Sequence, residues 1–259
     1  MDVLVTGGTG WLGRRVVAEL RGRGHRARVL SRRPGSGPDH FQGDLGTGAG
    51  LEAAVRGADA IVHAGSATRQ VWRYREVDVD GTRRLLELAR AAGVGHAAYV
   101  SIVGIDRVPS YPYYRVKRQT EGIVGAGGVP FSILRATQFP ELIDTFLRGF
   151  STLPGFVLLP AAWKFQVVHT RDVAAKLADV VTGEPAGMLP DFGGPKVQTL
   201  GEMAAGWLAA RRSRRRVIRI PVFGRTSRAF AAGALLSRQP PSGTLTWDDW
   251  LRERYGAHP

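Results

Sequence analysis

A tyrosine and a lysine that could exchange protons with a bound molecule stand four positions apart, at Tyr113 and Lys117. Residues i and i+4 lie on the same face of a helix, so one helix face would present both side chains. A phenol with its ordinary pKa of about 10 is a poor base at neutral pH. A nearby ammonium group favours the phenolate, so we expect Lys117 to lower the pKa of Tyr113 and make it a usable acid and base.

Ser101 is the third candidate, because it follows the strand-like run Ala98–Val100. Parallel sheets bind ligands at the carboxyl ends of their strands, so its hydroxyl could hold a substrate oxygen close to Tyr113. The three groups could pass a proton to or from a carbonyl oxygen while a hydride moves. Tyr111 and Tyr114 compete, but neither has a lysine four residues on. The structural alternatives are an aromatic residue packed at a helix start and a serine that forms a turn.

A glycine-rich turn, Thr6–Gly13, separates a strand-like run from the first helical pattern. In dinucleotide-binding turns the first glycine makes the tight turn, the second lets the backbone approach a pyrophosphate, and the third lets helix and strand pack closely. The free N–H groups of the helix start would then face the phosphates. The alternative is a turn that binds nothing, but the strand before it and the helix after it are the context that the motif requires. The predicted cofactor-binding residues of this turn are Gly7, Thr9, Gly10, Trp11, Leu12 and Gly13.

The end of the second predicted strand indicates which nucleotide is bound. A site selective for NAD places a carboxylate there for the ribose 2′-hydroxyl. This chain has Ser31 at that position, followed by Arg32 and Arg33, with no Asp or Glu between Leu20 and Pro38. Arginine binds a 2′-phosphate through charge-assisted hydrogen bonds, so NADP(H) is favoured over NAD(H). The alternative is a pair of solvated loop arginines in an arginine-rich chain.

The elements that must position these residues alternate between short apolar runs and helical patterns. The strand-like runs are Val3–Val5, Arg28–Leu30, His40–Gln42, Ala60–Val62, Ala98–Val100 and Phe131–Leu134. The helical patterns are Leu12–Arg21, Leu51–Val55, Val77–Ala91 and Tyr113–Val124. This alternation predicts an α/β fold of the Rossmann type, with a doubly wound parallel sheet and helices on both of its faces.

The last third of the chain is less regular. The predicted elements are a helix at Leu142–Phe150, a strand at Phe165–Val168, a helix at Val173–Val181 capped by Asp172, a helix at Leu200–Ala210, a strand at Val217–Ile220, a helix near Ser227–Leu236 and a final helix containing Trp247. Large apolar side chains here could form one wall of a substrate pocket or simply a core. The predicted substrate residues are Gln138, Phe139, Phe146 and Trp163. An apolar wall favours a hydrophobic substrate.

Several motifs together resemble one family. Thr6–Gly13, Gly43–Leu45 and Tyr99–Asp106 look like those of an atypical short-chain dehydrogenase/reductase of the NmrA-like, NAD(P)-binding kind. The match is extended by Tyr113-x-x-x-Lys117, Ile133–Phe139, Val167–Ala174 and Gly243–Trp247, so it covers essentially the whole chain. One departure is His63-Ala64-Gly65, where many such enzymes have Asn-Ala-Gly. Some NmrA-like proteins lack the tyrosine that this chain has at position 113.

The resemblance implies an NAD(P)-binding Rossmann core over residues 1–135 and a C-terminal substrate-binding region over 136–259, packed on the core as a single structural unit. By the same resemblance, Asp44 and Leu45 lie by the adenine, and Ala64, Gly65 and Ser66 line the adenosine side. Ala136 and Thr137 would lie near the nicotinamide. Lys117 can also hold the ribose hydroxyls.

Composition excludes several kinds of site. The chain has no cysteine, which removes a disulfide framework, a thiolate nucleophile and Cys-ligated zinc. No carboxylate–histidine spacing predicts a metal, and His63 and His169 are expected in the core or at its rim. No apolar run is long enough for a membrane span, and no leader pattern begins the chain. We therefore expect a cytoplasmic protein whose partner is a small molecule and not a membrane.

The chain is strongly basic, with a net charge of +14 from 36 Lys and Arg against 22 Asp and Glu. This balance could indicate polyanion binding, but we favour the arginine bias of a GC-rich genome, since charge bears on solubility and association and not on fold. The run Arg211–Arg216 is the strongest nucleic-acid-like signal. It follows a predicted helix, where cations complement the dipole, and it lacks interleaved aromatic residues. We interpret it as a solvated helix end and expect no nucleic-acid partner.

These observations predict an NADP(H)-dependent oxidoreductase that acts on a carbonyl/alcohol pair of a small hydrophobic substrate through Ser101, Tyr113 and Lys117. Two alternatives remain open, because a scaffold alone does not fix a reaction. One is a non-catalytic protein that senses NADP(H). The other is an epimerase or dehydratase built on the same scaffold. The oligomeric state is also open.

Overall fold

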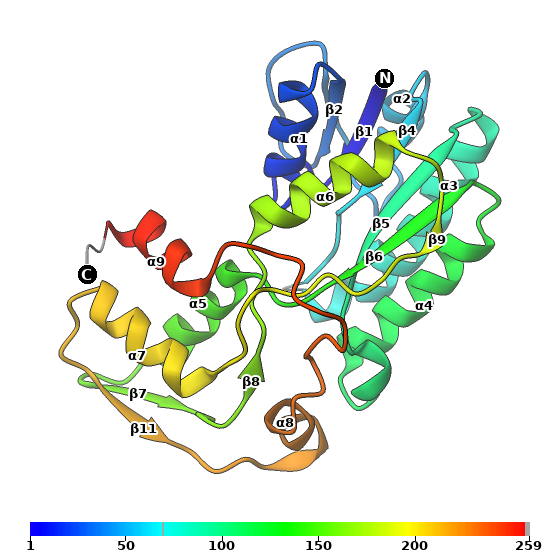
Figure 1. Cartoon of the computed structure of the whole chain (residues 1–259). Coiled ribbons are helices and arrows are strands. Elements are labelled where there is room, and N and C mark those ends of the chain that lie inside the picture. The colour runs from blue at the N-terminus through cyan, green and yellow to red at the C-terminus, as the bar shows by residue number, and fades with distance from the viewer. Residues whose placement is uncertain (69, 257–259) are drawn as a thin grey trace. The chain divides into compact units, whose positions relative to one another are not determined.

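The computed structural model describes residues 1–68 and 70–256 (Figure 1). The chain divides into two compact units. Unit 1 comprises Met1–Ser101, Pro112–Arg135 and Val173–Pro190, and unit 2 comprises Ile102–Tyr111, Ala136–Asp172 and the chain from Asp191 on. Each unit is thus made of three segments that are not continuous in sequence.

Unit 1 is built on a seven-stranded sheet in the order β3-β2-β1-β4-β5-β6-β9. The strands are β1 (Asp2–Thr6), β2 (Arg26–Ser31), β3 (His40–Gln42), β4 (Ala60–His63), β5 (His96–Ile102), β6 (Phe131–Ala136) and β9 (Gly187–Met188). The first six follow the strand order of doubly wound dinucleotide-binding sheets. The predicted Rossmann-type α/β fold is therefore confirmed.

Register in this sheet brings the carboxyl ends of neighbouring strands to one level. Thr6 at the end of β1 pairs with Leu30 of β2 on one side and with His63 of β4 on the other. His63 pairs in turn with Tyr99 of β5. The central strands are buried on both faces, as helix-covered parallel strands are, so the polar groups of this unit gather at the strand ends.

Two groups of helices cover the sheet (Figure 1). The helices are α1 (Gly13–Gly22), α2 (Leu51–Val55), α3 (Gly81–Ala91), α4 (Pro112–Ala126) and α6 (Thr170–Thr182). Helix α1 turns Val16, Val17 and Leu20 inward and ends at Gly22, as the sequence predicted. An ion pair of 2.5 Å between Arg23 and Asp179 joins α1 to α6.

The helix predicted from Val77 begins differently. A short 3-10 helix, Val71–Arg73, leads into a π-helical stretch, Arg75–Asp80, and only then does α3 begin. The hydroxyl of Thr82 donates to the carbonyl of Asp78 at 2.6 Å, and that of Thr120 shares its proton between the carbonyls of Asp78 and Val116, at 3.0 and 2.9 Å. These hydrogen bonds satisfy a carbonyl in the widened turn and fix Asp78 in place. Single π turns of this kind occur frequently at functional sites.

Unit 2 contains five α-helices or parts of them and two small sheets within the described residues. Its helices are α5 (Pro140–Gly149), α7 (Leu200–Ala210), α8 (Gly224–Ala231), α9 (Trp247–Tyr255) and the first turn of α6, with a 3-10 turn at Ile105–Arg107. Strand β8 (Lys164–Phe165) pairs antiparallel with β10 (Gln198–Thr199), and β7 (Phe156–Leu159) pairs parallel with β11 (Arg216–Arg219). Its core includes Trp207, whose indole N–H donates to Asp144 at 2.7 Å.

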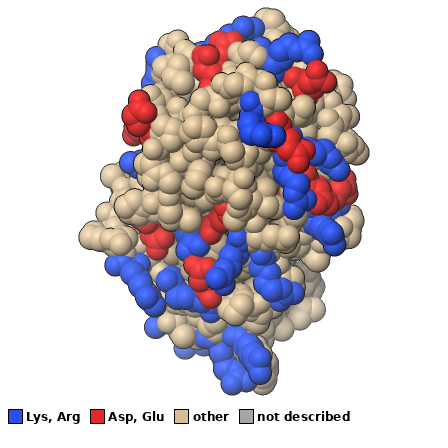
Figure 2. Space-filling view, turned by 90° about the vertical axis from the view of Figure 1, so that its right-hand side faces the viewer, with Lys and Arg blue, Asp and Glu red and all other residues tan. Residues whose placement is uncertain are grey.

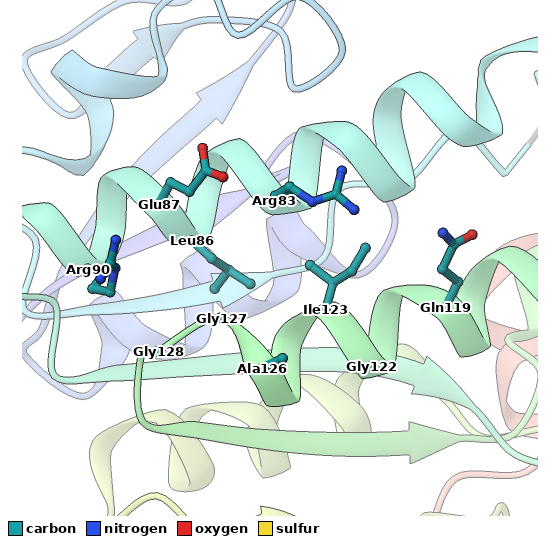
Figure 3. Close-up of a pocket in the computed structure, with 10 residues that line it drawn as sticks. All are labelled: Arg83, Leu86, Glu87, Arg90, Gln119, Gly122, Ile123, Ala126, Gly127 and Gly128. Carbon is teal, nitrogen blue, oxygen red and sulfur yellow. The ribbon is translucent and has the colours of Figure 1, made fainter.

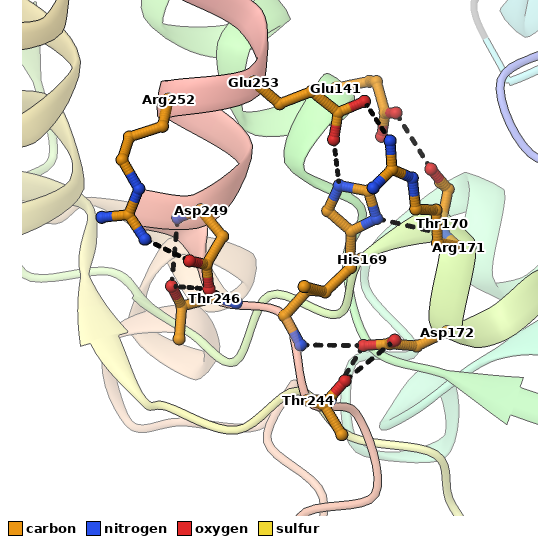
Figure 4. Close-up of polar contacts among 11 residues, drawn as sticks. Glu141, His169, Thr170, Arg171, Asp172, Thr244, Thr246, Asp249, Arg252 and Glu253 are labelled. Atoms are coloured by element: carbon orange, nitrogen blue, oxygen red, sulfur yellow. Dashed lines mark hydrogen bonds and ion pairs between the residues drawn. The ribbon is translucent and has the colours of Figure 1, made fainter. Parts of the chain in front are cut away.

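Several predicted details of unit 2 are wrong. The strand at Phe165–Val168 is only β8, and α8 begins at Gly224 instead of near Ser227. Asp172 does not cap a helix from residue 173, because α6 already begins at Thr170. Its carboxylate instead accepts the N–H groups of Thr244 and Leu245, at 2.8 and 3.1 Å, and so holds the segment before α9 (Figure 4).

Among the described residues, no helix is both long enough and apolar enough to cross a membrane.

Candidate cofactor and catalytic site

The turn between β1 and α1 is shaped by its glycines. Gly7 has a φ of +65°, and a Cβ there would lie 2.8 Å from the Cα of Gly65. A Cβ on Gly13 would lie 2.2 Å from the carbonyl oxygen of Gly7, so the helix can approach the turn only without a side chain. Gly10 is exposed, and only the Gly7 carbonyl lies near its Cβ direction. The tight turn at Gly7 and the close packing at Gly13 are thus as predicted, and the approach of a pyrophosphate to Gly10 stays a prediction.

Backbone donors remain at the start of α1. The helix has no side-chain cap at Leu12, and among the described residues no acceptor bonds the N–H groups of Leu12 and Gly13. Thr9 is exposed and Trp11 half-buried in the same turn. Unpaired N–H groups at a helix start, with the dipole behind them, favour a phosphate.

The end of β2 presents cations and no acid. The Ser31 hydroxyl donates to the carbonyl of Arg33 at 2.8 Å, and the His40 ring contacts the same carbonyl at 2.9 Å. The backbone after the strand is thereby folded back, while the side chains of Arg32 and Arg33 are exposed. Within the part of the chain that the structure describes, neither guanidinium has an ion pair or hydrogen bond.

Asp44 and Leu45 follow β3, where the resemblance places an adenine. The Asp44 carboxylate accepts the N–H of Gly46 at 2.7 Å and is bonded by Arg73 at 3.2 Å. Arg73 also bonds Glu76 at 2.6 Å, and these carboxylates raise its pKa. Leu45 is buried, and its side chain lies where a Cβ on Gly65 would have to be. Leu45 therefore packs directly under the loop after β4.

A hydrogen-bond chain through His63 links the ends of β1 and β4 to α3. Thr6 Oγ1 accepts the N–H of Gly65 at 3.0 Å and lies 2.7 Å from His63 Nδ1, and His63 Nε2 lies 2.9 Å from Thr82 Oγ1. Because Thr82 gives its proton to the Asp78 carbonyl, it must accept one from His63 Nε2, and Nδ1 then accepts from Thr6. Burial, helped by the charge of Lys117, lowers the pKa of His63 to about 3. The ring is a neutral core histidine, as predicted.

Tyr113, Ser66 and Asp78 form a second chain. The Ser66 hydroxyl donates to the buried carboxylate of Asp78 at 2.5 Å and lies 2.8 Å from the Tyr113 oxygen. Since Ser66 has one proton and gives it to Asp78, Tyr113 must donate to Ser66. Asp78 also accepts the N–H of Ala67 at 3.0 Å, and Thr68 Oγ1 lies 3.3 Å from the Tyr113 oxygen. The phenol is thus oriented by the loop after β4.

The pKa of Tyr113 moves opposite to the prediction. Burial raises it, and the negative charge of Asp78 raises it further. Lys117 does not bond the phenol, because its ammonium donates to the carbonyl of Val100 at 3.0 Å and lies 4.2 Å from the centre of the Tyr99 ring. The phenol in this arrangement is a proton donor and not a base.

Lys117 is itself buried on α4. Burial lowers its pKa to about 8, although the charges of Asp78 and Glu121 oppose that shift. It still carries its proton at neutral pH. The carbonyl that it bonds belongs to the residue before Ser101, so α4 places the ammonium at the carboxyl end of β5.

Ser101 lies at this same strand end. Its side chain is buried, and its hydroxyl has no hydrogen-bond partner among the described residues. A buried hydroxyl without a partner is costly, and native proteins retain such groups mainly for a water, an ion or a ligand. Ser101 thus follows the residue whose carbonyl Lys117 bonds, and its predicted catalytic role stays a prediction.

The remaining predicted residues lie in unit 2. Ala136 ends β6, and Thr137 accepts the N–H of Gly194 at 3.2 Å. Both amide atoms of the buried Gln138 have no partner within the described residues. Phe139 and Phe146 are half-buried at the start and in the body of α5.

Trp163 belongs to an aromatic cluster of unit 2. Its ring lies 5.2 Å from that of Phe230 and 6.4 Å from those of Phe150 and Phe165, and its N–H donates to Ser227 at 2.7 Å. Of the two alternatives open for this residue, these contacts favour a core role.

Sequence reasoning missed Asp78 and Thr68. Asp78 could have been suspected, because a carboxylate between Val77 and Val79 stands in a run that otherwise predicts buried helix. Thr68 left no signal, since its role depends on how the loop folds.

A groove of about 500 Å³ runs between α3 and α4 (Figure 3). It is lined by Arg83, Leu86, Glu87, Arg90, Gln119, Gly122, Ile123, Ala126, Gly127 and Gly128, and none of the predicted site residues is among them. Within the described residues, no group of three or more His, Asp or Glu side chains could hold a metal ion.

Comparison of the sequence with known proteins identifies the family of the chain. A family model described as NAD(P)H-binding matches residues 7–182, which include the glycine turn, Ser101, Tyr113 and Lys117. The chain belongs to the NAD(P)H-binding family. The predicted resemblance to atypical short-chain dehydrogenases/reductases and the predicted nucleotide binding are both confirmed.

Two curated relatives of this NAD(P)H-binding protein are reductases. It is 33% identical over 189 residues to a ceramide reductase of Caulobacter vibrioides. This alignment covers 68% of this chain and 59% of the relative. It is 26% identical over 312 residues to the chloroplastic divinyl chlorophyllide a 8-vinyl-reductase of Oryza sativa subsp. indica, covering 98% and 75%. The match thus spans less than two thirds of the ceramide reductase.

Solved structures show the same fold. A short-chain dehydrogenase/reductase superfamily protein from Agrobacterium tumefaciens with bound NAD has a TM-score of 0.75 at 23% identity, covering 99% of this chain and 96% of that one. An NADPH-dependent quinone oxidoreductase from Escherichia coli has a TM-score of 0.72 at 19% identity, covering 97% and 98%. The fold therefore occurs with both forms of the cofactor.

The turn can be tested with a matched pair of glycines on α1. Gly13→Ala should weaken NADPH or NADH binding at least about 10-fold, because the new Cβ must displace the Gly7 carbonyl and so distort the turn. Gly22→Ala adds the same atom at the other end of the helix, where nothing lies within 4 Å, and should leave binding unchanged. Calorimetric titration measures both. Equal affinities for the two variants would show that the turn does not hold the nucleotide.

Proposed function

We propose that this protein is an NADP(H)-dependent reductase of a carbonyl group on a hydrophobic substrate. The proposal rests on one observation above all. The Ser101 hydroxyl is buried without a partner among the described residues, at the strand end where α4 places the Lys117 ammonium. A substrate carbonyl oxygen is the acceptor that such a hydroxyl lacks, and Tyr113 stands one helical turn before Lys117 to protonate it.

The residues at the glycine turn fit a dinucleotide. The N–H groups of Leu12 and Gly13 would hold its pyrophosphate, where a side chain on Gly13 would collide with the turn. Arg32 and Arg33 are exposed and have no acidic partner among the described residues, so they could bind a 2′-phosphate. The position of Ser31 holds no carboxylate that would repel that phosphate. When bound, the nicotinamide supplies the hydride.

Tyr113 delivers the proton. In reduction the phenol O–H turns from Ser66 to the substrate oxygen. The O–H bond then breaks and its proton passes to that oxygen, which leaves a tyrosinate. Lys117, protonated and buried, stabilises that negative charge in a low-dielectric surrounding. The Thr68 hydroxyl, 3.3 Å from the phenol oxygen, can donate to it at the same moment.

Asp78 keeps Tyr113 in the protonated form that reduction requires. Its carboxylate accepts the hydrogen bond of the Ser66 hydroxyl. Ser66 can therefore only accept a hydrogen bond from Tyr113, which helps to keep the phenol protonated. The charge of Asp78 also raises the pKa of Tyr113 and that of Lys117. Both effects keep protons on the groups that a reductase uses as acids. Asp78 is therefore a positioning residue that acts through Ser66.

A hydrophobic substrate is supported from two sides. The short helix after the Ser66–Thr68 loop exposes Val71 and also Trp72, whose side chain is 80% exposed. Curated relatives include the ceramide reductase and a 3-beta-hydroxysteroid dehydrogenase of Mycolicibacterium neoaurum, 34% identical over 114 residues. The latter covers 38% of this chain and 31% of the relative. Their names point to lipid-like substrates.

Tyr113→Phe should lower kcat for ketone reduction by about 10²–10⁴-fold, since it removes the general acid, and leave NADPH affinity unchanged. Tyr111→Phe is the matched control and should leave kcat unchanged. A panel of ketones with lengthening alkyl chains, followed by loss of nicotinamide absorbance, measures this. Undiminished turnover in Tyr113→Phe would refute the assignment. NADPH binding by the wild type without turnover on the whole panel would indicate a sensor, or a protein that returns the hydride to its substrate.

The double change Arg32→Ala and Arg33→Ala should weaken NADPH binding by about 10- to 100-fold and leave NADH binding unchanged, because only NADPH carries the 2′-phosphate. Arg26→Ala removes a cation from the same strand that is already paired with Asp2 and Asp39, and serves as control. Calorimetry with both nucleotides gives the result. Equal losses for NADPH and NADH would contradict the proposed preference.

Asp78→Asn tests the positioning role through pH. An asparagine can accept from Ala67 or from Ser66 but not from both, so its N–H must face one of them. If the asparagine N–H donates to Ser66, the Ser66 hydroxyl donates to Tyr113. The loss of the Asp78 charge also lowers the pKa of the phenol. The acid limb of kcat/KM for alcohol oxidation should therefore shift to lower pH by about one unit or more.

The Ser66→Ala background provides the control for this shift. Without the hydroxyl, Asp78→Asn can act only through charge, so the displacement of the pH profile should shrink. A purely structural Asp78 would lower activity at every pH and leave the profile in place, and that result would remove its positioning role.

A further inference from the structure

The run Arg211–Arg216 is not used by the candidate site, yet it leads into an unusual surface of unit 2. We call this surface the β7–β11 patch. It consists of the two-stranded ribbon β7–β11 and the residues that flank it, namely Leu153, Phe156, Leu158, Arg212, Arg214, Arg216, Ile218, Arg219, Ile220, Phe223 and Arg225.

The ribbon has one inner face and one outer face. In its parallel register Phe156 stands beside Arg216, and Leu158 beside Ile218. Residues two apart along a strand share a face, so these four side chains lie on the same side. The intervening residues of β7, Val157 and Leu159, are fully buried. The side with Phe156 and Ile218 is therefore the outer one. Arg219 pairs with Leu159 and is not on that side, but it is exposed at the end of the ribbon.

The outer face is apolar where water would favour polar groups. Phe156 and Ile218 are each 42% exposed, and on the flanks Leu153 is 51% and Phe223 is 77% exposed. Single exposed apolar side chains are ordinary on protein surfaces, but a set gathered on one ribbon and its flanks marks an interaction surface.

The same surface carries positive charge without compensation. The sequence has no Asp or Glu from Met203 to Trp247, and none from Thr145 to Arg171. Among the described residues, no ion pair or hydrogen bond is formed by the side chains of Arg212, Arg214, Arg216, Arg219 and Arg225. Arg215 differs, since it donates to the carbonyl of Ser151.

Arginines elsewhere are commonly paired, as Arg23, Arg73 and Arg135 of unit 1 are. Figure 2 shows Lys and Arg side chains in blue on one face of the molecule, some beside red Asp and Glu side chains and some apart from them. The arginines of the β7–β11 patch thus differ from these paired arginines in having no ion pair within the described residues.

The combination selects one kind of partner. Nucleic acid would use the arginines, but it gains little from Ile218 and Leu153, and the patch offers few aromatic platforms. A second copy of the same patch would set arginines against arginines. An anionic phospholipid surface satisfies both features, because its headgroups attract arginine and its acyl boundary accepts Phe and Ile side chains.

We propose that the β7–β11 patch docks the protein on membranes containing anionic phospholipid. This contact needs no spanning helix, and it departs from the expectation from sequence that the protein has no membrane partner. It is independent of the proposed reductase activity, since none of the proposed catalytic residues belongs to the patch.

The test is sedimentation of the full chain with vesicles of phosphatidylcholine, alone or with roughly one third phosphatidylglycerol. Binding is expected only to the anionic vesicles, and it should fall as salt is added. A basic variant, with Arg214, Arg216 and Arg225 changed to Ser, should partition on the order of 100-fold less, because each basic residue near such a surface contributes about a factor of five. An apolar variant, with Ile218 and Phe223 changed to Ser, keeps its charge and should also bind less.

The control changes Arg56, Arg75 and Arg83 of unit 1 to Ser. It loses the same charge as the basic variant and should bind vesicles like the wild type. Thermal unfolding and NADPH titration check that each variant is folded.

Three outcomes would overturn the proposal. The first is no binding to anionic vesicles at low salt, and the second is an equal loss in the control variant. The third is unchanged vesicle binding by the apolar variant together with tight binding of a DNA duplex that depends on the arginines, which would make the patch a nucleic-acid site. If the protein does not bind vesicles and forms a dimer that the apolar variant abolishes, the proposal is overturned as in the first outcome.

Discussion

The buried ring of His63 is the constraint on which the candidate site depends. It is held between the hydroxyls of Thr6 and Thr82, so the carboxyl ends of β1 and β4 are tied to the first turn of α3. A neutral ring can serve both hydroxyls only in one tautomer, with its proton on Nε2. Any charge on it would leave Thr6 without an acceptor for its proton. The low pKa that burial imposes on His63 therefore keeps Nδ1 free to accept from Thr6.

From this anchor the positions of the charged groups follow. Thr82, fixed by His63, holds the carbonyl of Asp78 in a π-helical stretch, and that stretch turns the Asp78 carboxylate toward the loop after β4. The carboxylate then orders Ser66 and Ala67, and through Ser66 the phenol of Tyr113. Burying Asp78 and Lys117 in one unit is costly for each alone. The charge of Asp78 opposes the desolvation that lowers the pKa of Lys117, and it adds to the burial that raises the pKa of Tyr113.

The parts of this arrangement that the sequence could predict are those fixed by local rules. The alternation of apolar runs with helical patterns fixes the order of strands β1 to β6, and the glycine spacing at residues 7, 10 and 13 fixes the turn, because each depends on contacts close in sequence. The partner of Lys117 could not be predicted, since it depends on how α4 meets β5, and the expected effect on the pKa of Tyr113 was therefore wrong. The π turn and Asp78 were missed for the same reason. An aspartate between two valines indicates only that a buried carboxylate needs hydrogen-bond donors, and it does not indicate which residues supply them.

The arginine run shows the opposite limitation. Its charge was evident in the sequence, but charge alone does not distinguish a solvated helix end from a binding surface. The distinction lies in what surrounds the charge. Arg211 does end α7 and lies 4.3 Å from the Trp207 ring, as a cation at a helix end should. The arginines after it continue into β11, where register with β7 places Arg216 beside Phe156 on an outward face. Exposed phenylalanine is not expected at a solvated helix end. The geometry of the ribbon, more than the number of arginines, therefore distinguishes a binding surface from a solvated end.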